Sequence, residues 1–355
     1  MTHSIKPQPG IDDIVLYKGG ESRLDGHAEV LKLSSNENPF GPPEAAKAAL
    51  IATAGTLHRY PSTDHADLRG AIADVHGLDV DRIICGAGSD EILTFLCQAY
   101  AGPGLEVIYT EHGFSMYRIL ALGAGATPVV VAERDRLVDV DAILDAVTPA
   151  TRLVFLTNPG NPTGAVSSLT QLQALLGLAE RHDFIVASDE CYYEIYPDES
   201  APPAGLLSAA AAMGNAAYRR VLVFNSLSKR SNAPGLRSGF VAGDLELIAS
   251  FLRYRTYHGC AMPPATQAAS IRAWQDEEHV IANRALYREK FRAVTDLLQP
   301  ALDVQIPPAG FYLRPVTPVD DCRFARGLLQ QQNVTVLPGS YLSRDTAAGN
   351  PGNNR

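Results

Sequence analysis

The sequence predicts an α/β protein with a largely parallel β-sheet, followed by a smaller α+β domain. Three observations lead to this fold class. Short apolar runs of strand length alternate with amphipathic segments of helical length, which is typical of βα units in a parallel sheet. This alternation stops near residue 265, where a long helical segment begins. The 355 residues also exceed what one hydrophobic core usually serves, so we expect two domains.

The elements of each domain follow from these patterns. Residues 1–40 are interrupted by proline and glycine and are expected to form an N-terminal arm. The large domain is expected at residues 41–265, with strands in IICG, LEVIYTE, TPVVVAE, RLVFLT, FIVASDE, RRVLVFNSL and FVAGD. Its helices are expected in PEAAKAALIATA, HADLRGAIADVHG, SDEILTFLCQAYA, SMYRILALGAG and SLTQLQALLGLAERHD.

The small domain is expected at residues 266–355. A single long helix over residues 265–298 should lead into it. A strand in VQIPPAGFYLRPV, a helix in CRFARGLLQQQ and a strand in VTVLPGSYL should follow.

Composition excludes several classes of protein. Hydrophobic residues make up 46% and charged residues 19% of the chain, as in a globular enzyme rather than a disordered chain. The net charge of −9 argues against a nucleic-acid partner. The five cysteines are scattered and never form a CxxC pair, so neither a disulfide framework nor a metal site is expected. With no signal-like N-terminus and no apolar run of membrane length, we expect a cytoplasmic protein without membrane contact.

Polar, glycine-rich segments follow the apolar runs. They read CGAGSD, TEHGF, TNPGNPTG, SDECYY and NSLSK. In parallel sheets, ligands bind at the carboxyl ends of the strands. These segments are therefore expected to converge on one site.

Lys229 follows the buried-looking run VLVF. Loss of solvation lowers the pKa of a lysine toward useful nucleophilicity, and such lysines form Schiff bases with carbonyl compounds such as pyridoxal phosphate. The alternative is a surface lysine at a strand end. Nearby Ser226 and Ser228 offer hydroxyl groups, and Arg237 offers a guanidinium fork suited to phosphate oxygens.

A second anion site is indicated by Gly88, Ser89 and Asp90 in the GAGSD turn. Glycine permits close approach of a ligand, and a helix beginning at Ser89 would present free backbone N–H groups. The same residues are equally compatible with an ordinary capped helix start.

Asp189 follows the apolar run FIVAS, where an unpaired charge would be costly. A pyridinium nitrogen would be a suitable partner, although a helix cap or structural ion pair is an equal alternative. Tyr192 and Asn161 could hold a phenolic oxygen of the same cofactor, while NPGNPTG could be simply a turn.

Two aromatic residues complete the candidate site. Phe114, at a strand end, could stack on a flat cofactor or belong to the core. Tyr60, which precedes a proline, could reach a site in a partner subunit or cap its own helix.

The ordered motifs NPxNPTG, SDExY and SLSKxxxxxGLR resemble those of the fold-type I pyridoxal-phosphate aminotransferases. The resemblance covers nearly the whole chain and implies a large domain with a mostly parallel seven-stranded sheet. It also implies pyridoxal 5′-phosphate as the cofactor. Lys229 resembles the Schiff-base lysine, and Asp189 resembles the pyridinium partner.

The resemblance carries over to the remaining candidates as well. Tyr192 and Asn161 resemble the residues at the ring oxygen, and Phe114 resembles the stacking aromatic ring. Tyr60 resembles a tyrosine that reaches the phosphate in the partner subunit, which implies a homodimer with shared active sites. The residues that resemble the phosphate-binding cup are Gly88, Ser89, Asp90, Ser226, Ser228 and Arg237.

The two halves of the chain resemble different subfamilies. Residues 1 to about 160, with LSSNENPFGPP, LHRYP and GAGSDEI, are similar to histidinol-phosphate aminotransferases. The remainder, with SDECYYEIY and SLSKRSNAPGLRSGF, is similar to N-succinyldiaminopimelate aminotransferases. Leu337 stands near the place where histidinol-phosphate enzymes usually carry a phosphate-binding arginine. The arginine that binds the substrate carboxylate in the family would fall about two residues beyond Arg355, so we expect a truncated small domain and impaired activity.

The resemblance implies transfer of an amino group from glutamate with ping-pong kinetics. The acceptor would be either N-succinyl-2-amino-6-ketopimelate or imidazole-acetol phosphate. Alternatives are a decarboxylase of an amino-acid phosphate and a catalytically impaired cofactor-binding protein. A nicotinamide-dependent oxidoreductase is a poorer match because GAGSD lacks the third glycine and the following acidic residue.

Overall fold

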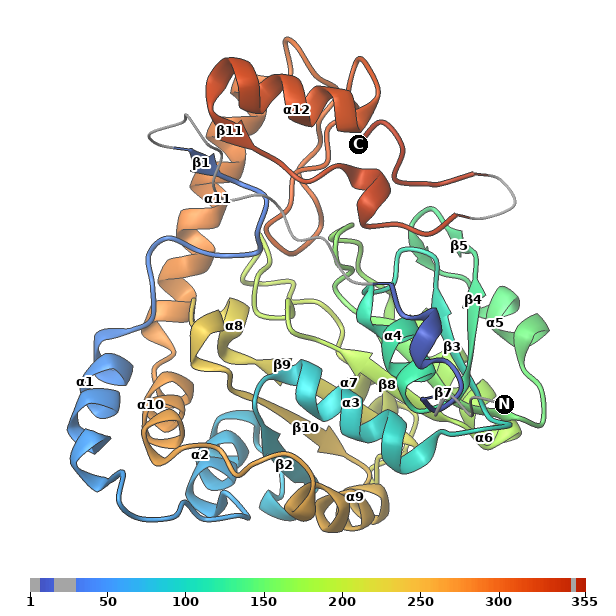
Figure 1. The fold of residues 1–355 in the computed structure, drawn as a ribbon, viewed down its shortest axis with the longest axis vertical. Helices are drawn as coiled ribbons and strands as arrows, with labels where there is room; N and C mark the ends of the chain where they lie inside the picture. Colours follow the sequence, from blue (N-terminus) through green and yellow to red (C-terminus); the bar gives the residue numbers. More distant parts are fainter. Residues whose placement is uncertain (1–6, 16–29, 346–348) are drawn as a thin grey trace, which may run out of the picture.

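A seven-stranded sheet forms the centre of the protein, in the strand order β2-β10-β9-β8-β7-β3-β4 (Figure 1). The computed structural model describes residues 7–15, 30–345 and 349–355. The strands of this sheet are β2 (Ile83–Gly86), β3 (Glu106–Thr110), β4 (Thr127–Val131), β7 (Thr151–Thr157), β8 (Ile185–Asp189), β9 (Val221–Ser226) and β10 (Gly239–Gly243). All pairs are parallel except those of β10, which runs antiparallel to both neighbours. The predicted fold class is confirmed.

The sheet is buried on both faces. Val154 and Leu156 of β7 belong to one hydrophobic cluster, and Leu153 and Phe155 belong to the other, because successive side chains of a strand point to opposite faces. Strands covered on both sides read as continuous apolar runs, which explains the sequence pattern.

Helices cover both faces and extend beyond the sheet. The α-helices are α1 (Glu44–Thr53), α2 (Ala66–His76), α3 (Ser89–Tyr100), α4 (Met116–Gly123), α5 (Val140–Ala146), α6 (Leu169–His182), α7 (Leu206–Ala212), α8 (Leu227–Arg230), α9 (Leu245–Tyr257), α10 (Pro264–Gln275), α11 (Glu278–Leu298) and α12 (Asp321–Gln332). Short 3₁₀ helices lie at Ile11–Asp13, Ala54–Thr56, Val80–Arg82, Pro234–Leu236 and Gly339–Tyr341. None of the helices in the described ranges combines the length and the apolar composition that a membrane span requires.

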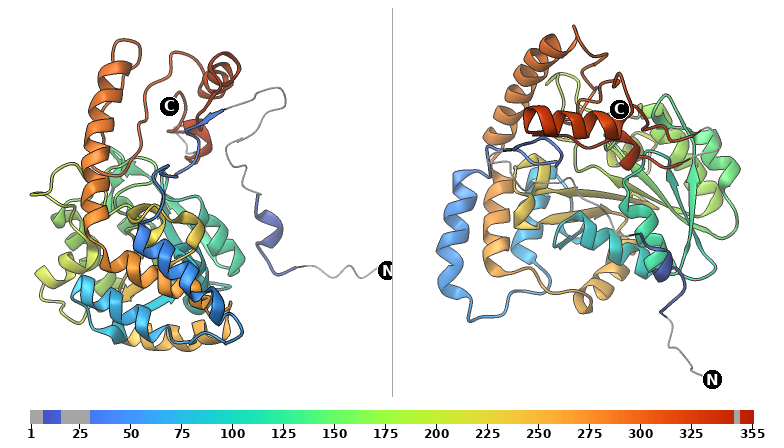
Figure 2. Two further views of the ribbon diagram at one scale, coloured as in Figure 1. Left: turned by 90° about the vertical axis from the view of Figure 1, so that its left-hand side faces the viewer. Right: turned by 45° about the horizontal axis from the view of Figure 1, so that its top comes forward.

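The expected single helix over residues 265–298 is wrong, because the chain breaks between α10 and α11. Helix α10 packs against α1 and α2, whereas α11 rises away from them toward α12 (Figures 1 and 2). Two contacts account for the break. The buried guanidinium of Arg230 binds the carbonyls of Ala273 and Trp274 at the end of α10. The Asp276 carboxylate then accepts the backbone N–H of His279 in the first turn of α11.

The C-terminal part contains less sheet than expected. Within the described residues, the segment 304–316 makes only an isolated bridge between Asp303 and Val316, since consecutive prolines at 307 and 308 lack the N–H groups of a ladder. Of the expected strand at 334–342, only β11 (Val334–Thr335) forms, and it pairs in parallel with β1 (Leu31–Lys32). A two-stranded hairpin, β5 (Glu133–Arg134) and β6 (Leu137–Val138), lies at the β4 edge. The division at residues 40 and 265 stays a prediction.

Candidate active site

The polar segments after the strands meet at one edge of the sheet, as expected. Cys191, in SDECYY, links this segment to NSLSK and CGAGSD. The Ser226 hydroxyl donates to the Cys191 sulfur at 3.4 Å, and the Cys191 thiol donates to the Ser89 oxygen at 3.4 Å. Ser226 ends β9, Cys191 follows β8 and Ser89 begins the helix after β2. The carboxyl ends of these strands therefore converge on one site.

Lys229 lies on α8, a single turn of helix directly after β9. Its amine donates to the carbonyl oxygen of Asn36 at 2.5 Å. The rings of Tyr192 and Phe311 lie 5.8 and 5.9 Å from the same nitrogen. Burial lowers the pKa of the Lys229 amine below its usual value, so the neutral nucleophilic form is more accessible than in a solvated lysine.

Asp189 is the last residue of β8 and is 6% exposed. One carboxylate oxygen accepts the backbone N–H of Cys191 at 3.1 Å, and the other lies 3.5 Å from the Tyr117 hydroxyl. Burial raises the pKa of Asp189. A cationic group beside this carboxylate would favour its ionised form, which is the environment that a pyridinium nitrogen supplies.

Gly88, Ser89 and Asp90 form the start of α3, with Gly88 at φ 86°. The Arg237 guanidinium bonds to the carbonyl of Ala87 at 3.3 Å and lies 3.5 Å from the Asp90 carboxylate. Glycine is favoured at position 88 because its φ of 86° lies in a region that other residues rarely adopt, and a Cβ atom there would also displace the Arg237 guanidinium. The twelve-residue helix α3 and Arg237 together suit an anionic group.

Tyr192 and Asn161 are joined by two residues that sequence reasoning missed. The side-chain amide of Asn36 donates to the hydroxyls of both Tyr192 and Tyr312 at 2.9 Å. The Tyr312 hydroxyl in turn donates to the Asn161 amide oxygen at 3.0 Å. Asn36 comes from the segment SSNENPF, whose proline-flanked polar residues were a signal that the arm approaches a site.

The remaining predicted residues are less closely joined to this group. Phe114 is half-buried and meets Tyr117 edge-on at 6.0 Å, while Tyr117 stacks on Phe155 at 4.5 Å. Ser228 is half-buried on α8, one residue before Lys229. Tyr60 is fully exposed, and the structure does not bring it to the site of its own chain.

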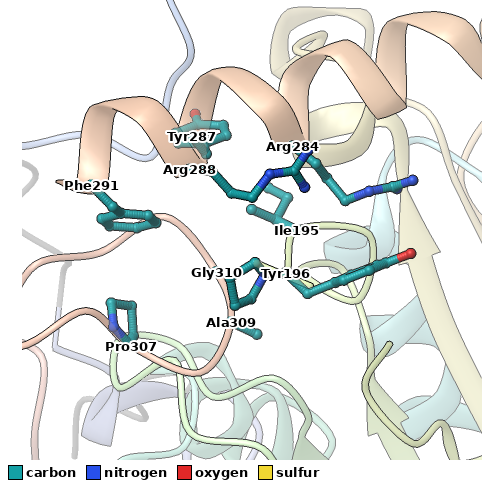
Figure 3. A pocket seen from close by; sticks show the side chains of 10 residues that line it. Ile195, Tyr196, Arg284, Tyr287, Arg288, Phe291, Pro307, Ala309 and Gly310 are labelled. Atoms are coloured by element: carbon teal, nitrogen blue, oxygen red, sulfur yellow. The ribbon is translucent and has the colours of Figure 1, made fainter. Parts of the chain in front are cut away.

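A small hollow lies between α11 and residues 195–197 and 307–310 (Figure 3). Its volume of about 10 Å³ leaves room for roughly one water molecule. Arg284 and Arg288 border it, and both are paired with Glu199. The hollow is therefore not a second anion site.

A largely parallel sheet with a partly desolvated amine, a buried carboxylate and a helix start suited to an anion at its carboxyl edge is the arrangement expected of a fold-type I pyridoxal-phosphate enzyme. Residues 28–350 match the family model of aminotransferase class I and II, and the chain belongs to this family. It is a pyridoxal-phosphate-dependent aminotransferase and acts on small-molecule amino donors and acceptors.

Three similar proteins illustrate the relationship. A histidinol-phosphate aminotransferase of Cereibacter sphaeroides is 50% identical over 286 residues, which cover 80% of this chain and 76% of the relative. An aminotransferase structure from Neisseria meningitidis is 38% identical with a TM-score of 0.85, covering 97% of this chain and 93% of its own. The N-succinyldiaminopimelate aminotransferase structure from Mycobacterium tuberculosis is 28% identical with a TM-score of 0.81, covering 90% and 86%.

The residues present fit pyridoxal phosphate. A cofactor with a cationic ring nitrogen, an aldehyde and a phosphate needs a carboxylate, an amine and an anion site within one ligand's reach. Asp189, Lys229 and the Ser89–Arg237 region supply these groups, and the thiol of Cys191 links the first region to the last through Ser89. Burial raises the pKa of the Asp189 carboxylate, and a cationic neighbour such as a pyridinium nitrogen would offset this cost of ionisation.

Proposed function

We propose that this aminotransferase interconverts histidinol phosphate and imidazole-acetol phosphate, with glutamate and 2-oxoglutarate as the second pair. The choice of substrate rests on the 50% identity to a histidinol-phosphate aminotransferase over four-fifths of the chain. Further relatives of the same name are 48% and 54% identical.

Each site residue receives a role in this proposal. Lys229 holds the cofactor aldehyde, Asp189 pairs with the ring nitrogen, and Tyr192 and Asn161 hold the ring oxygen. Phe114 covers one face of the ring. The phosphate is held by Gly88, Ser89, Asp90, Ser226, Ser228 and Arg237, with Tyr60 reaching it from a partner subunit.

The chain's own groups move the proton that amino transfer requires. Bound pyridoxal phosphate supplies an aldehyde for the donor amine and a ring that accepts an electron pair from the donor Cα. Lys229 takes the proton from that Cα as general base, and the lowered pKa of its amine makes the neutral, proton-accepting form more accessible. Asp189, kept ionised by its cationic neighbour, sustains the electron demand of the ring. The phenol of Tyr192 stays protonated because burial raises its pKa well above the usual value.

N-succinyldiaminopimelate is the second candidate substrate. The solved enzyme of that name shares the fold at 28% identity, and Leu337 lacks the positive charge that a substrate phosphate would use. Decarboxylation of an amino-acid phosphate would use the same cofactor site, and only the products distinguish this reaction from amino transfer.

A donor screen on the purified protein with Lys229→Ala as control tests both the site and the substrate. We expect histidinol phosphate and glutamate to convert the bound cofactor to its amine form in a single turnover, with kcat/KM at least about tenfold above N-succinyldiaminopimelate. Lys229→Ala should lose the borohydride-trapped covalent adduct and about 10³-fold or more of the rate. A higher kcat/KM with N-succinyldiaminopimelate would show that this compound, and not histidinol phosphate, is the substrate. Release of carbon dioxide would show that the enzyme is a decarboxylase. A covalent adduct that persists in Lys229→Ala would show that another lysine binds the cofactor.

A further inference from the structure

Arg230 follows Lys229 in the chain and has no part in the chemistry above, yet its side chain is completely buried. Its guanidinium donates to the carbonyls of Ala273 at 3.0 Å and Trp274 at 3.5 Å. It also pairs with Glu277 and lies 3.6 Å from Glu194. The Arg230 guanidinium therefore binds the carbonyl groups at the C-terminal end of α10, where a positive charge also complements the helix dipole.

The next two residues bind the same region. The Ser231 hydroxyl lies 2.9 Å from the His279 ring nitrogen, and Asn232 exchanges two amide hydrogen bonds with Asn283 at 2.9 and 3.0 Å. His279 and Asn283 both belong to α11. All three residues after Lys229 are thus tied to the junction of α10 and α11.

Glu194 extends this network to the turn that carries Tyr192. It lies 3.6 Å from both Arg230 and Arg284, and the Arg284 guanidinium covers the Tyr196 ring at 4.6 Å (Figure 3). Arg284 also pairs with Glu199 at 2.8 Å. One network of charged side chains, centred on the buried Arg230 and Arg284, therefore joins the Tyr192 turn, the Lys229 turn and α11.

Helix α8 needs such support because it has only four residues. A single turn of helix is unstable on its own, since nucleation costs more than one hydrogen bond returns. The place of the Lys229 amine is thus decided by tertiary contacts of its neighbours. A displacement of about 1 Å in a reacting group can cost about 100-fold in rate.

We propose that Arg230 is a positioning residue, which fixes the Lys229 amine by clamping α8 to the junction of α10 and α11. The proposal rests on the proposed role of Lys229. Arg230 touches neither substrate nor cofactor and acts only through the turn that it holds.

The test compares Arg230→Lys with Arg272→Lys in the holoenzyme. Arg272 lies on the same end of α10 but is exposed, so its replacement leaves the clamp intact. Lysine keeps the charge of Arg230 but loses the planar fork and the stacking on Trp274, which lies 4.7 Å away. We expect Arg230→Lys to slow the single-turnover half-reaction with glutamate by about 10- to 100-fold. The KM for glutamate and the dissociation constant of pyridoxal phosphate should change less than about threefold, and Arg272→Lys should match the parent.

A half-reaction rate within twofold of the parent in folded Arg230→Lys would overturn the proposal. An equal loss of rate and cofactor affinity would also overturn it, because it would mean general disruption of the site. If Arg230→Lys does not fold, Glu277→Gln carries the test, since it weakens the same clamp from a half-exposed position. It should slow the half-reaction at unchanged cofactor affinity, and a parental rate would refute the clamp. Loss of the borohydride adduct in Lys229→Ala is measured alongside, so that failure of the lysine assignment is recognised separately.

Discussion

At the residue scale, His76 shows how packing removes an ionisable group from titration. Its ring packs against those of Phe240 and Trp274, each with a centroid 5.4 Å away. Its Nε2 is buried without a hydrogen-bond partner among the described residues. Burial, with a further contribution from Arg230, lowers the pKa of His76 to about 4. In the unfolded chain the pKa returns toward its ordinary value, so the unfolded state binds a proton first.

We therefore expect His76→Phe to reduce the acid sensitivity of the protein. The stability that comes from a neutral His76 is complete above pH 6.5 and is lost as the pH falls toward 4. Between pH 7 and 4.5, urea unfolding should show a smaller loss for His76→Phe, by up to about 3 kcal/mol. The exposed His182→Phe serves as control and should keep the parental pH dependence. Part of the loss should persist in His76→Phe because burial also lowers the pKa of His65 to about 4. Identical pH dependence in parent and His76→Phe would contradict the expectation.

At the scale of elements, the start of β10 is packed directly against the start of α3. A Cβ atom at Gly239 would lie 2.8 Å from the backbone nitrogen of Ser89 and 2.9 Å from the Asn225 carbonyl oxygen. These are backbone atoms and cannot rotate away. The antiparallel strand β10 thus reaches the site only because this residue lacks a side chain.

Gly239→Ala should push β10 away from α3 and disturb the proposed phosphate site. We expect a destabilisation of about 1–3 kcal/mol in thermal or urea unfolding, together with weaker binding of pyridoxal phosphate. Gly235→Ala is the matched control, because a Cβ atom there meets nothing within 4 Å. Equal stability and affinity of the two variants would show that the contact is relieved without cost.

At the scale of the whole molecule, we expect a homodimer that completes the cofactor site with Tyr60. Large apolar side chains stand in solvent in this part of the chain: Ile51 is 71%, Leu57 63% and Tyr60 102% exposed. Exposed apolar surface of this kind marks an interaction site. Cover by a second copy would explain both the exposure and the resemblance of Tyr60 to a residue shared between subunits.

Sedimentation equilibrium should give twice the chain mass of 38.1 kDa. Tyr60→Ala should remain dimeric but bind pyridoxal phosphate about tenfold more weakly, as expected for one hydrogen bond to a charged group. Leu297→Ala, at an exposed position on α11, should match the parent in both measurements. A monomeric mass would refute the shared site.

Much of the site was open to prediction. Lys229, Asp189, Asn161 and Ser226 all lie in polar segments that follow apolar runs, and their strand ends meet at one edge of the sheet. Tyr312 and Tyr117 were missed because each sits in an apolar context that also suits a core residue. The break between α10 and α11 was missed because the apolar spacing continues through it; Asp276, which caps α11, was a local signal, whereas the contact of Arg230 with the end of α10 is distant in sequence.

The sequence by itself determined the parallel sheet and the place of the site, because apolar runs, helical spacing and the polar segments between them are local and periodic. Only the tertiary structure decided what surrounds the reactive groups. Asn36 reaches Lys229 across 193 positions of the chain, and Arg230 ends a helix more than forty positions away. Such contacts depend on which surfaces pack together in the folded protein. Hydrophobic periodicity and secondary-structure propensity describe only local sequence and do not predict them.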